Sequence, residues 1–279
     1  MNRVGGSYDR RESLKRGVYI LPNLVTTGSL FAGFYGIVAT MNGNYSLAAW
    51  FILISAIFDA LDGKVARLTG TTSRFGVEYD SLADLVAFGV APGLLMYAWA
   101  LKPFGKLGWL AAFLYVVCGA LRLARFNVQV DTVESKRFVG LPIPAAAWMV
   151  SSCVLIFFHL GGTGTIRKVS VLLLIYVLAY LMVSNVRYYS FKDPELVRRQ
   201  PFGILVLSII FIIVIVAQPE VMLFSCASIY VCSGPVGALL SRLRRTKAVK
   251  HGGVTTEERS VTVDKPEADV PMDDNSVKS

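Results

Sequence analysis

Residues 45–100 read YSLAAWFILISAIFDALDGKVARLTGTTSRFGVEYDSLADLVAFGVAPGLLMYAWA. Two apolar runs, 45–67 and 76–100, lie on either side of a short polar linker at 68–75. Each run is long enough to cross a bilayer, because a helix needs about 20 mostly apolar residues to span about 30 Å of hydrocarbon. The short linker predicts that the two helices are antiparallel neighbours, with their linker ends together at one membrane surface.

The rest of the chain repeats this pattern, so that we expect about eight spans. Of the 279 residues, 54% are hydrophobic and 17% are charged, and the mean hydropathy is +0.55. A soluble domain has about 45–50% apolar and about 25% charged residues. The composition therefore predicts an all-α integral membrane protein and excludes a soluble enzyme, a disordered chain and a disulfide-stapled secreted module. The other candidate spans are 21–41, 107–127, 143–160, 167–185, 202–217 and 220–240.

Lysines and arginines are distributed unevenly between the two sides of this arrangement. Twenty-one fall on the side that holds both termini and four on the other side. Since cytoplasmic loops carry the excess of basic residues, both termini are expected in the cytoplasm. The net charge of +9 then reflects membrane topology, and we predict no nucleic-acid partner. We expect a cytoplasmic segment at 1–20, a transmembrane domain at 21–240 and a polar, disordered tail at 241–279.

Four aspartates lie where acidic residues are costly, at the linker ends of the two central spans. Asp59 and Asp62 are three residues apart, and Asp80 and Asp84 are four apart, so each pair shares one helix face. The antiparallel arrangement lets all four carboxylates converge near the inner membrane surface. Acidic groups in a span usually mark a functional site.

Four carboxylates at this spacing repel one another unless a cation lies among them. Oxygen ligands favour a hard divalent ion such as Mg²⁺, Mn²⁺ or Ca²⁺ over zinc. One alternative is that Asp59 and Asp80 only pair with Arg67 and Arg74 at the helix ends. Another is a divalent-cation transporter, although no series of acids continues towards the opposite membrane surface.

The segment DALDGKVARLTGTTSRFGVEYDSLAD at 59–84 fits the pattern D-x2-D-G-x2-A-R-x8-G-x3-D-x3-D. In this it resembles the CDP-alcohol phosphotransferases, integral membrane enzymes of phospholipid synthesis with a helical-bundle fold. Every fixed position of the pattern is filled. The matching residues are Asp59, Asp62, Gly63, Ala66, Arg67, Gly76, Asp80 and Asp84.

This resemblance implies a role for each matching residue. Asp59, Asp62 and Asp80 are expected to ligate Mg²⁺ or Mn²⁺. Asp84 is expected to act as the general base, and it is also a candidate ligand. Small residues make room for the CDP group of the donor, and an arginine partners the acids or a phosphate. These donor-site residues are Gly63, Ala66, Gly76 and Arg67.

Outside the signature, five stretches resemble the membrane-integral phosphatidylserine synthases within this family. The stretches are 21–37, 81–97, 120–127, 137–147 and 184–192. The resemblance implies transfer of a phosphatidyl group from CDP-diacylglycerol to L-serine, with release of CMP. It also implies a homodimer among membrane lipids, with the active site facing the cytoplasm. Glycerol 3-phosphate and inositol phosphate remain alternative acceptors.

Polar residues at the cytoplasmic ends of other spans are candidates for contacts with serine. Arg122 and Arg125 share a helix face, with Asn127 just beyond, and Lys136 follows in the next loop. A cation among them could bind the serine carboxylate. The alternative is that these side chains only reach for the membrane interface.

Two residues at the start of the first span are candidates for the donor site. Asn23 and Thr26 could hydrogen-bond the nucleotide phosphates. Their alternative role is to cap a helix that begins near Pro22.

Overall fold

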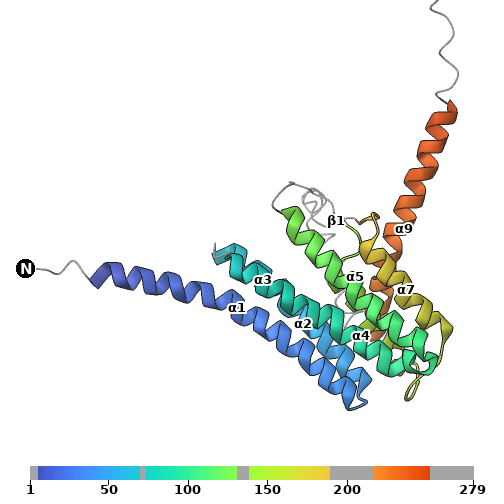
Figure 1. The fold of residues 1–279 in the computed structure, drawn as a ribbon, viewed down its shortest axis with the longest axis horizontal. Coiled ribbons are helices and arrows are strands. Elements are labelled where there is room, and N and C mark those ends of the chain that lie inside the picture. The colour runs from blue at the N-terminus through green and yellow to red at the C-terminus, as the bar shows by residue number, and fades with distance from the viewer. Residues whose placement is uncertain (1–5, 70–72, 131–137, 189–216, 252–279) are drawn as a thin grey trace, which may run out of the picture. The chain divides into compact units, whose positions relative to one another are not determined.

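The computed structural model describes residues 6–69, 73–130, 138–188 and 217–251, and these ranges are almost entirely helical (Figure 1). The expectation of an all-α protein is confirmed. The chief helices are α1 (Gly6–Met41), α2 (Tyr45–Thr69), α3 (Arg74–Asp84), α4 (Ala91–Met96), α5 (Lys106–Val130), α6 (Ile143–His159), α7 (Val169–Val183) and α9 (Pro219–His251).

Five of the helical segments in the described ranges are long and apolar enough to cross a membrane. They are Leu21–Met41, Tyr45–Ala66, Arg74–Phe104, Lys106–Val128 and Pro219–Leu239. The shorter helices α6 and α7 are also apolar and match the fifth and sixth expected spans. The seventh expected span, 202–217, lies almost wholly outside the described residues. A multi-pass membrane protein follows from these helices, and the number eight stays a prediction.

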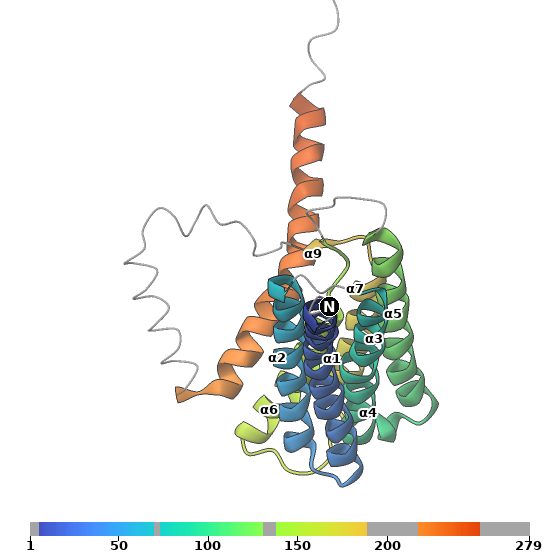
Figure 2. The same cartoon turned by 90° about the vertical axis from the view of Figure 1, so that its left-hand side faces the viewer.

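α1 and α2 form an antiparallel hairpin that packs against α4 (Figure 2). The turn between them needs Gly43, whose φ is +73°. Asn44 then accepts a hydrogen bond from the Leu47 amide at 3.3 Å. Within the hairpin, the buried hydroxyls of Ser29 and Ser55 lie 2.8 Å apart. Such hydrogen bonds between small polar residues hold helices together where the surroundings are apolar.

The third span is helical throughout but changes its winding. Ser73 caps α3 by accepting a hydrogen bond from the Gly76 amide. A π-helical stretch, η1 (Leu85–Val90), follows Asp84 directly and leads into α4. The span ends with a second π-helical stretch, η2 (Tyr97–Leu101), and the 3₁₀ turn η3 (Lys102–Phe104). The buried Tyr115 hydroxyl of α5 donates to the Phe88 carbonyl at 3.2 Å. This bond joins α5 to the irregular segment that follows Asp84.

The core lies where the third span meets α5, α6 and α7. Its largest fully buried side chains include Trp99, Tyr115 and Phe88. Two strands of two residues each, β1 (Phe138–Val139) and β2 (Arg187–Tyr188), pair antiparallel and join the segment before α6 to the segment after α7. The sequence pattern does not predict these strands, because two residues are too few to show an alternation.

Two helices extend beyond the boundaries expected from hydropathy. α1 begins at Gly6, so Pro22 lies inside a helix and the expected helix start near Pro22 is wrong. α9 continues to His251, so that residues 241–251 are helical and not part of a disordered tail. Hydropathy measures the length that crosses the membrane, whereas helices continue into polar sequence of good propensity. Residues Met1–Leu239 form one compact unit, and Leu240–Ser279 form a second.

Candidate metal centre and acceptor site

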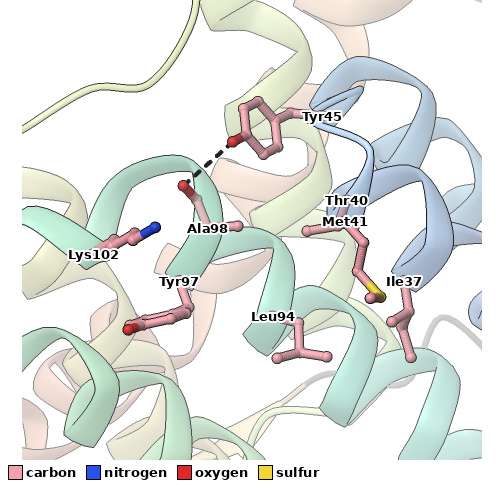
Figure 3. Close-up of a pocket in the computed structure, with 9 residues that line it drawn as sticks. Ile37, Thr40, Met41, Tyr45, Leu94, Tyr97, Ala98 and Lys102 are labelled. Atoms are coloured by element: carbon pink, nitrogen blue, oxygen red, sulfur yellow. Dashed lines mark hydrogen bonds between the residues drawn. The ribbon is translucent and has the colours of Figure 1, made fainter.

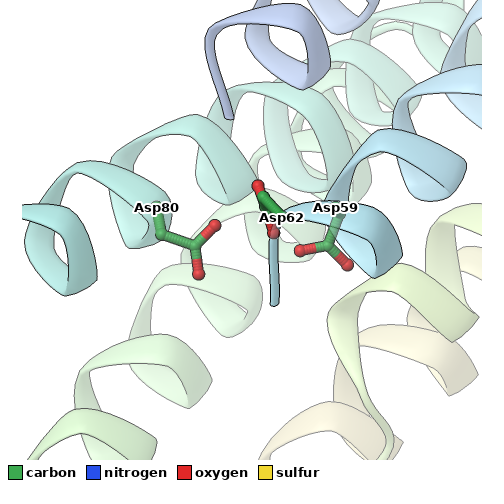
Figure 4. A group of neighbouring side chains, drawn as sticks. All are labelled: Asp59, Asp62 and Asp80. Atoms are coloured by element: carbon green, nitrogen blue, oxygen red, sulfur yellow. The ribbon is translucent and has the colours of Figure 1, made fainter. Parts of the chain in front are cut away.

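Three of the four signature acids converge at the linker ends of α2 and α3 (Figure 4). Asp59 and Asp62 come from α2 and Asp80 comes from α3, and their carboxylates point towards one another. One carboxylate oxygen from each lies within 4.8 Å of the others. The expected convergence of these three side chains is therefore present, and it follows from the helical spacing and the short linker.

Asp62 is held from a third helix. The buried Thr26 hydroxyl of α1 donates to Asp62 Oδ2 at 2.9 Å. Thr26 also lies 3.1 Å from the Pro22 carbonyl, one turn earlier in α1. Asp62 is only 5% exposed. Thr26 therefore orients a buried carboxylate, and it does not cap a helix.

Asp84 lies beside this group but is not part of it. Its side chain interacts electrostatically with Asp59, Asp80 and Asp62. Its Oδ1 atom is buried and has no hydrogen-bond partner among the described residues. The Arg122 guanidinium of α5 interacts electrostatically with Asp84, and the buried Arg122 Nε atom likewise has no described hydrogen-bond partner. Both Asp84 and Arg122 therefore keep a buried polar atom without a described hydrogen-bond partner.

The three converging carboxylates fit a hard divalent cation. All the donor atoms are oxygens, and their mutual distances allow one ion to contact all three residues. Among the side chains that the structure describes, Arg74 is exposed and forms no ion pair with an acid. Arg74 therefore does not neutralise the cluster, while the Arg67 side chain lies outside the described part.

The expected donor-site residues surround the carboxylates. A Cβ atom added at Gly76 would lie 3.3 Å from Asn23 Oδ1 and 3.1 Å from Ser73 Oγ, so only glycine leaves this corner open. A Cβ atom at Gly63 would meet no atom of the described residues within 4 Å, apart from its own chain neighbours and helix backbone. Ala66 follows on α2 and is half-buried.

The candidate serine-binding residues that the structure describes differ in their contacts. Arg122 faces Asp84. Arg125 is exposed and donates to Asn185 Oδ1 at 3.1 Å, and Asn127 donates to Ser81 Oγ at 2.9 Å. Lys136 lies outside the described residues.

Two tyrosines, Tyr188 and Tyr230, lie near this site, and no motif or spacing in the sequence indicates this. Tyr230 of α9 interacts electrostatically with Arg122, and its ring centroid lies 5.6 Å from that of Tyr188. Burial raises the pKa of Tyr188 to about 12, so its hydroxyl stays protonated and donates to the Val231 carbonyl at 3.3 Å. Because α9 is far from the signature in sequence, only packing reveals that Tyr230 approaches Arg122.

Comparison with known proteins agrees with this geometry. Residues 19–187 match the family model of CDP-alcohol phosphatidyltransferases. A CDP-diacylglycerol–serine O-phosphatidyltransferase of Helicobacter pylori is 45% identical over 181 residues, which cover 64% of this chain and 75% of that protein. An enzyme of the same name from Bacillus subtilis is 35% identical over 172 residues, 62% of this chain and 91% of that protein.

A further relative is named for a different lipid product. The archaetidylserine synthase of Methanothermobacter thermautotrophicus is 39% identical over 170 residues, 60% of this chain and 69% of that protein. The matched region runs from within α1 to just beyond α7 and contains all four signature acids. The chain belongs to the CDP-alcohol phosphatidyltransferase family.

Proposed function

We propose that this protein transfers the phosphatidyl group of CDP-diacylglycerol to the hydroxyl of L-serine, giving phosphatidylserine and CMP. The observation that carries the proposal is the convergence of the Asp59, Asp62 and Asp80 carboxylates at the linker ends of α2 and α3, with Asp84 next to them. Relatives named for serine as acceptor support this choice of alcohol.

Asp59, Asp62 and Asp80 would hold Mg²⁺ or Mn²⁺. When bound, the ion would neutralise the charge of the donor's pyrophosphate and stabilise the departing CMP. Thr26 keeps the Asp62 carboxylate oriented for this task. The open space at Gly63 and the corner at Gly76 allow the nucleotide to approach the helix backbones.

Asp84 would act as the general base. It accepts the proton of the serine hydroxyl while the serine oxygen forms a bond to the phosphorus that carries diacylglycerol. The bond between this phosphorus and the CMP oxygen breaks, and CMP leaves with the electron pair. A base must lie within hydrogen-bonding reach of the proton that it takes, and the unpartnered Asp84 Oδ1 is available for this contact.

Arg122 would bind the carboxylate of serine. A guanidinium binds carboxylates through two parallel hydrogen bonds, which fixes the orientation of the acceptor as well as its position. Since Arg122 interacts with Asp84, serine bound there has its hydroxyl near the base. Glycerol 3-phosphate and inositol phosphate carry a dianionic phosphate and would need further cations.

The remaining parts of the proposal concern the whole protein. The active site would face the cytoplasm, with the segment 1–20 and the tail 241–279 on the same side and the catalytic domain at 21–240. The enzyme would work as a homodimer among membrane lipids. Cross-linking in membranes, followed by gel electrophoresis, would test the dimer.

The test of the function is CMP release by the purified full chain with CDP-diacylglycerol. Serine and glycerol 3-phosphate are compared, each with and without Mg²⁺ or Mn²⁺. We expect release that requires both serine and the ion. Release with glycerol 3-phosphate alone would overturn serine as the acceptor. Ion flux into vesicles without any CMP release would favour the transporter.

In the same assay, Asp59→Asn and Asp80→Asn should weaken donor binding and the response to the ion together, because each removes a proposed ligand. Ser81→Ala is a control from the same helix as Asp80. Unchanged dependence on ion concentration in both Asn variants would contradict the assignment of the ligands.

A further inference from the structure

A pocket of about 280 Å³ lies at the ends of α1 and α2 that are remote from the carboxylates (Figure 3). It is bounded by the last turn of α1, the turn at Gly43, the start of α2 and the end of the third span. Asp59 follows Tyr45 by 14 residues of one helix, which is about 21 Å along the axis. The pocket is therefore separate from the proposed active site and lies near the opposite membrane surface.

The sequence around Pro103 explains the polar side of this pocket. In η2 the Lys102 amide bonds to the Tyr97 carbonyl, which is the spacing of a π-helix. The Ala98 carbonyl would need the amide of residue 103, but proline has none. Ala98 accepts instead a long hydrogen bond of 3.5 Å from the Tyr45 hydroxyl. The carbonyl keeps capacity for a second donor, because a carbonyl oxygen has two lone pairs.

The pocket has a polar side and an apolar side. Figure 3 shows Lys102 and the Ala98 carbonyl on one side of the pocket, and Ile37, Leu94 and Met41 on the other side. Met41 is 81% exposed and Leu94 is 41% exposed. The apolar wall therefore continues onto the outer surface of a membrane-spanning segment, where acyl chains would contact it.

We propose that this pocket binds an anionic glycerophospholipid from the leaflet opposite the active site. The lipid phosphate would contact Lys102, a headgroup hydroxyl would donate to the Ala98 carbonyl, and an acyl chain would lie against Leu94 and Ile37. None of the nine described residues that line the pocket is acidic, so that none of them would neutralise Lys102. A zwitterionic lipid would bring its own ammonium group towards Lys102 and bind less well.

The test is native mass spectrometry of the purified full chain with equal amounts of phosphatidylglycerol and phosphatidylcholine. We expect the wild type to retain phosphatidylglycerol preferentially. Lys102→Ala should reduce this retention about fivefold, since one lysine near a membrane surface contributes on the order of a fivefold preference for anionic lipid. Lys106→Ala is the matched control, because Lys106 is also exposed but does not line the pocket.

A second variant tests the apolar side. Leu94→Trp fills the pocket without changing its charge and should also reduce retention of phosphatidylglycerol. Equal retention by the Lys102 and Lys106 variants would overturn the proposal, and so would displacement of the lipid by inorganic phosphate. Loss of a dimer in Leu94→Trp without loss of lipid would identify a second copy as the occupant. Bound lipid is measured here and not CMP release, so the result is independent of the proposed activity.

Discussion

At the scale of single residues, the four signature acids are alike in chemistry but differ in their surroundings. Asp62 is buried and accepts a hydrogen bond from Thr26. Asp84 retains a buried oxygen without a described partner and faces Arg122. We propose on the basis of these different contacts that Asp62 is a metal ligand held in place and that Asp84 is the general base.

Replacement of Asp84 by Asn should lower turnover about 10²- to 10⁴-fold, the usual contribution of a general base. Binding of CDP-diacylglycerol and of Mn²⁺ should be largely preserved, because the three converging carboxylates remain. The measurement is single-turnover CMP release together with donor binding. Glu78→Gln, an exposed acid on the same helix, is the control. A turnover rate of Asp84→Asn close to that of the wild type would mean that Asp84 is not the general base.

Replacement of Thr26 by Val should increase the concentration of Mn²⁺ needed for half-maximal activity about tenfold, because a hydrogen bond to a buried carboxylate is lost. Titration of CMP release with Mn²⁺ measures this effect. Thr40→Val is a matched control: both threonines are 4% exposed in α1, but the Thr40 hydroxyl donates only to the Gly36 carbonyl. Equal shifts in the two variants would mean that Thr26 matters only for packing.

Arg122 and Arg125, like the four acids, are alike in chemistry but differ in their surroundings. Arg122→Gln should raise the KM for serine at least about tenfold and leave the KM for CDP-diacylglycerol nearly unchanged, because a charge-assisted contact to the acceptor is lost. Arg125→Gln should have a smaller effect on serine, since Arg125 is exposed and already bonds to Asn185. Steady-state kinetics with each substrate varied measure these effects. A larger increase of the KM for serine in Arg125→Gln than in Arg122→Gln would mean that Arg125 binds the acceptor.

At the scale of elements, the close approach of α1 to η1 positions the residues beside the site. A Cβ atom at Gly33 would lie 2.6 Å from Ala87 Cα, which no real Cβ contact allows. Ala87 belongs to the π-helical stretch that begins directly after Asp84. Small residues at this crossing therefore let α1 bring Thr26 to Asp62 while η1 holds Asp84.

Gly33→Ala should destabilise the protein by about 1–3 kcal/mol, because the added methyl group meets backbone that cannot rotate away. Thermal unfolding in detergent, followed by the loss of the monodisperse peak, measures the change. Gly28→Ala in the same helix is the control: its Cβ atom would meet the Phe58 ring at 3.2 Å, a side chain able to turn. The gain in helix propensity is the same in both variants. An equal Tm for the two variants would therefore mean that α1 and η1 can accommodate the added methyl group at Gly33.

At the scale of the whole molecule, the carboxylates and the lipid pocket lie at opposite ends of the same helices. This arrangement predicts that the two sites are reached from opposite sides of the membrane. The excess of basic residues on the carboxylate side predicts that this side faces the cytoplasm.

A cysteine introduced at Lys106 should react with a membrane-impermeant maleimide in intact cells, whereas one introduced at Lys64 should react only after permeabilisation. Both lysines are exposed, and Lys64 lies on α2 just beyond Asp62. The four native cysteines are first replaced by alanine, and the unmodified cysteine-free chain is the control. Labelling of the cysteine at position 64 in intact cells would mean that the carboxylate side faces away from the cytoplasm.

The sequence by itself determined the membrane-spanning helices and the convergence of Asp59, Asp62 and Asp80. Hydropathy and the three- to four-residue spacing of a helix face are local properties, and a short linker forces neighbouring helices together. Only the tertiary structure decided that Thr26 donates to Asp62, that Arg122 interacts electrostatically with Asp84 and with Tyr230 of α9, and that Arg125 bonds to Asn185. These contacts join residues of helices distant in sequence. Their geometry depends on the angle and depth at which the helices pack, which small residues such as Gly33 set.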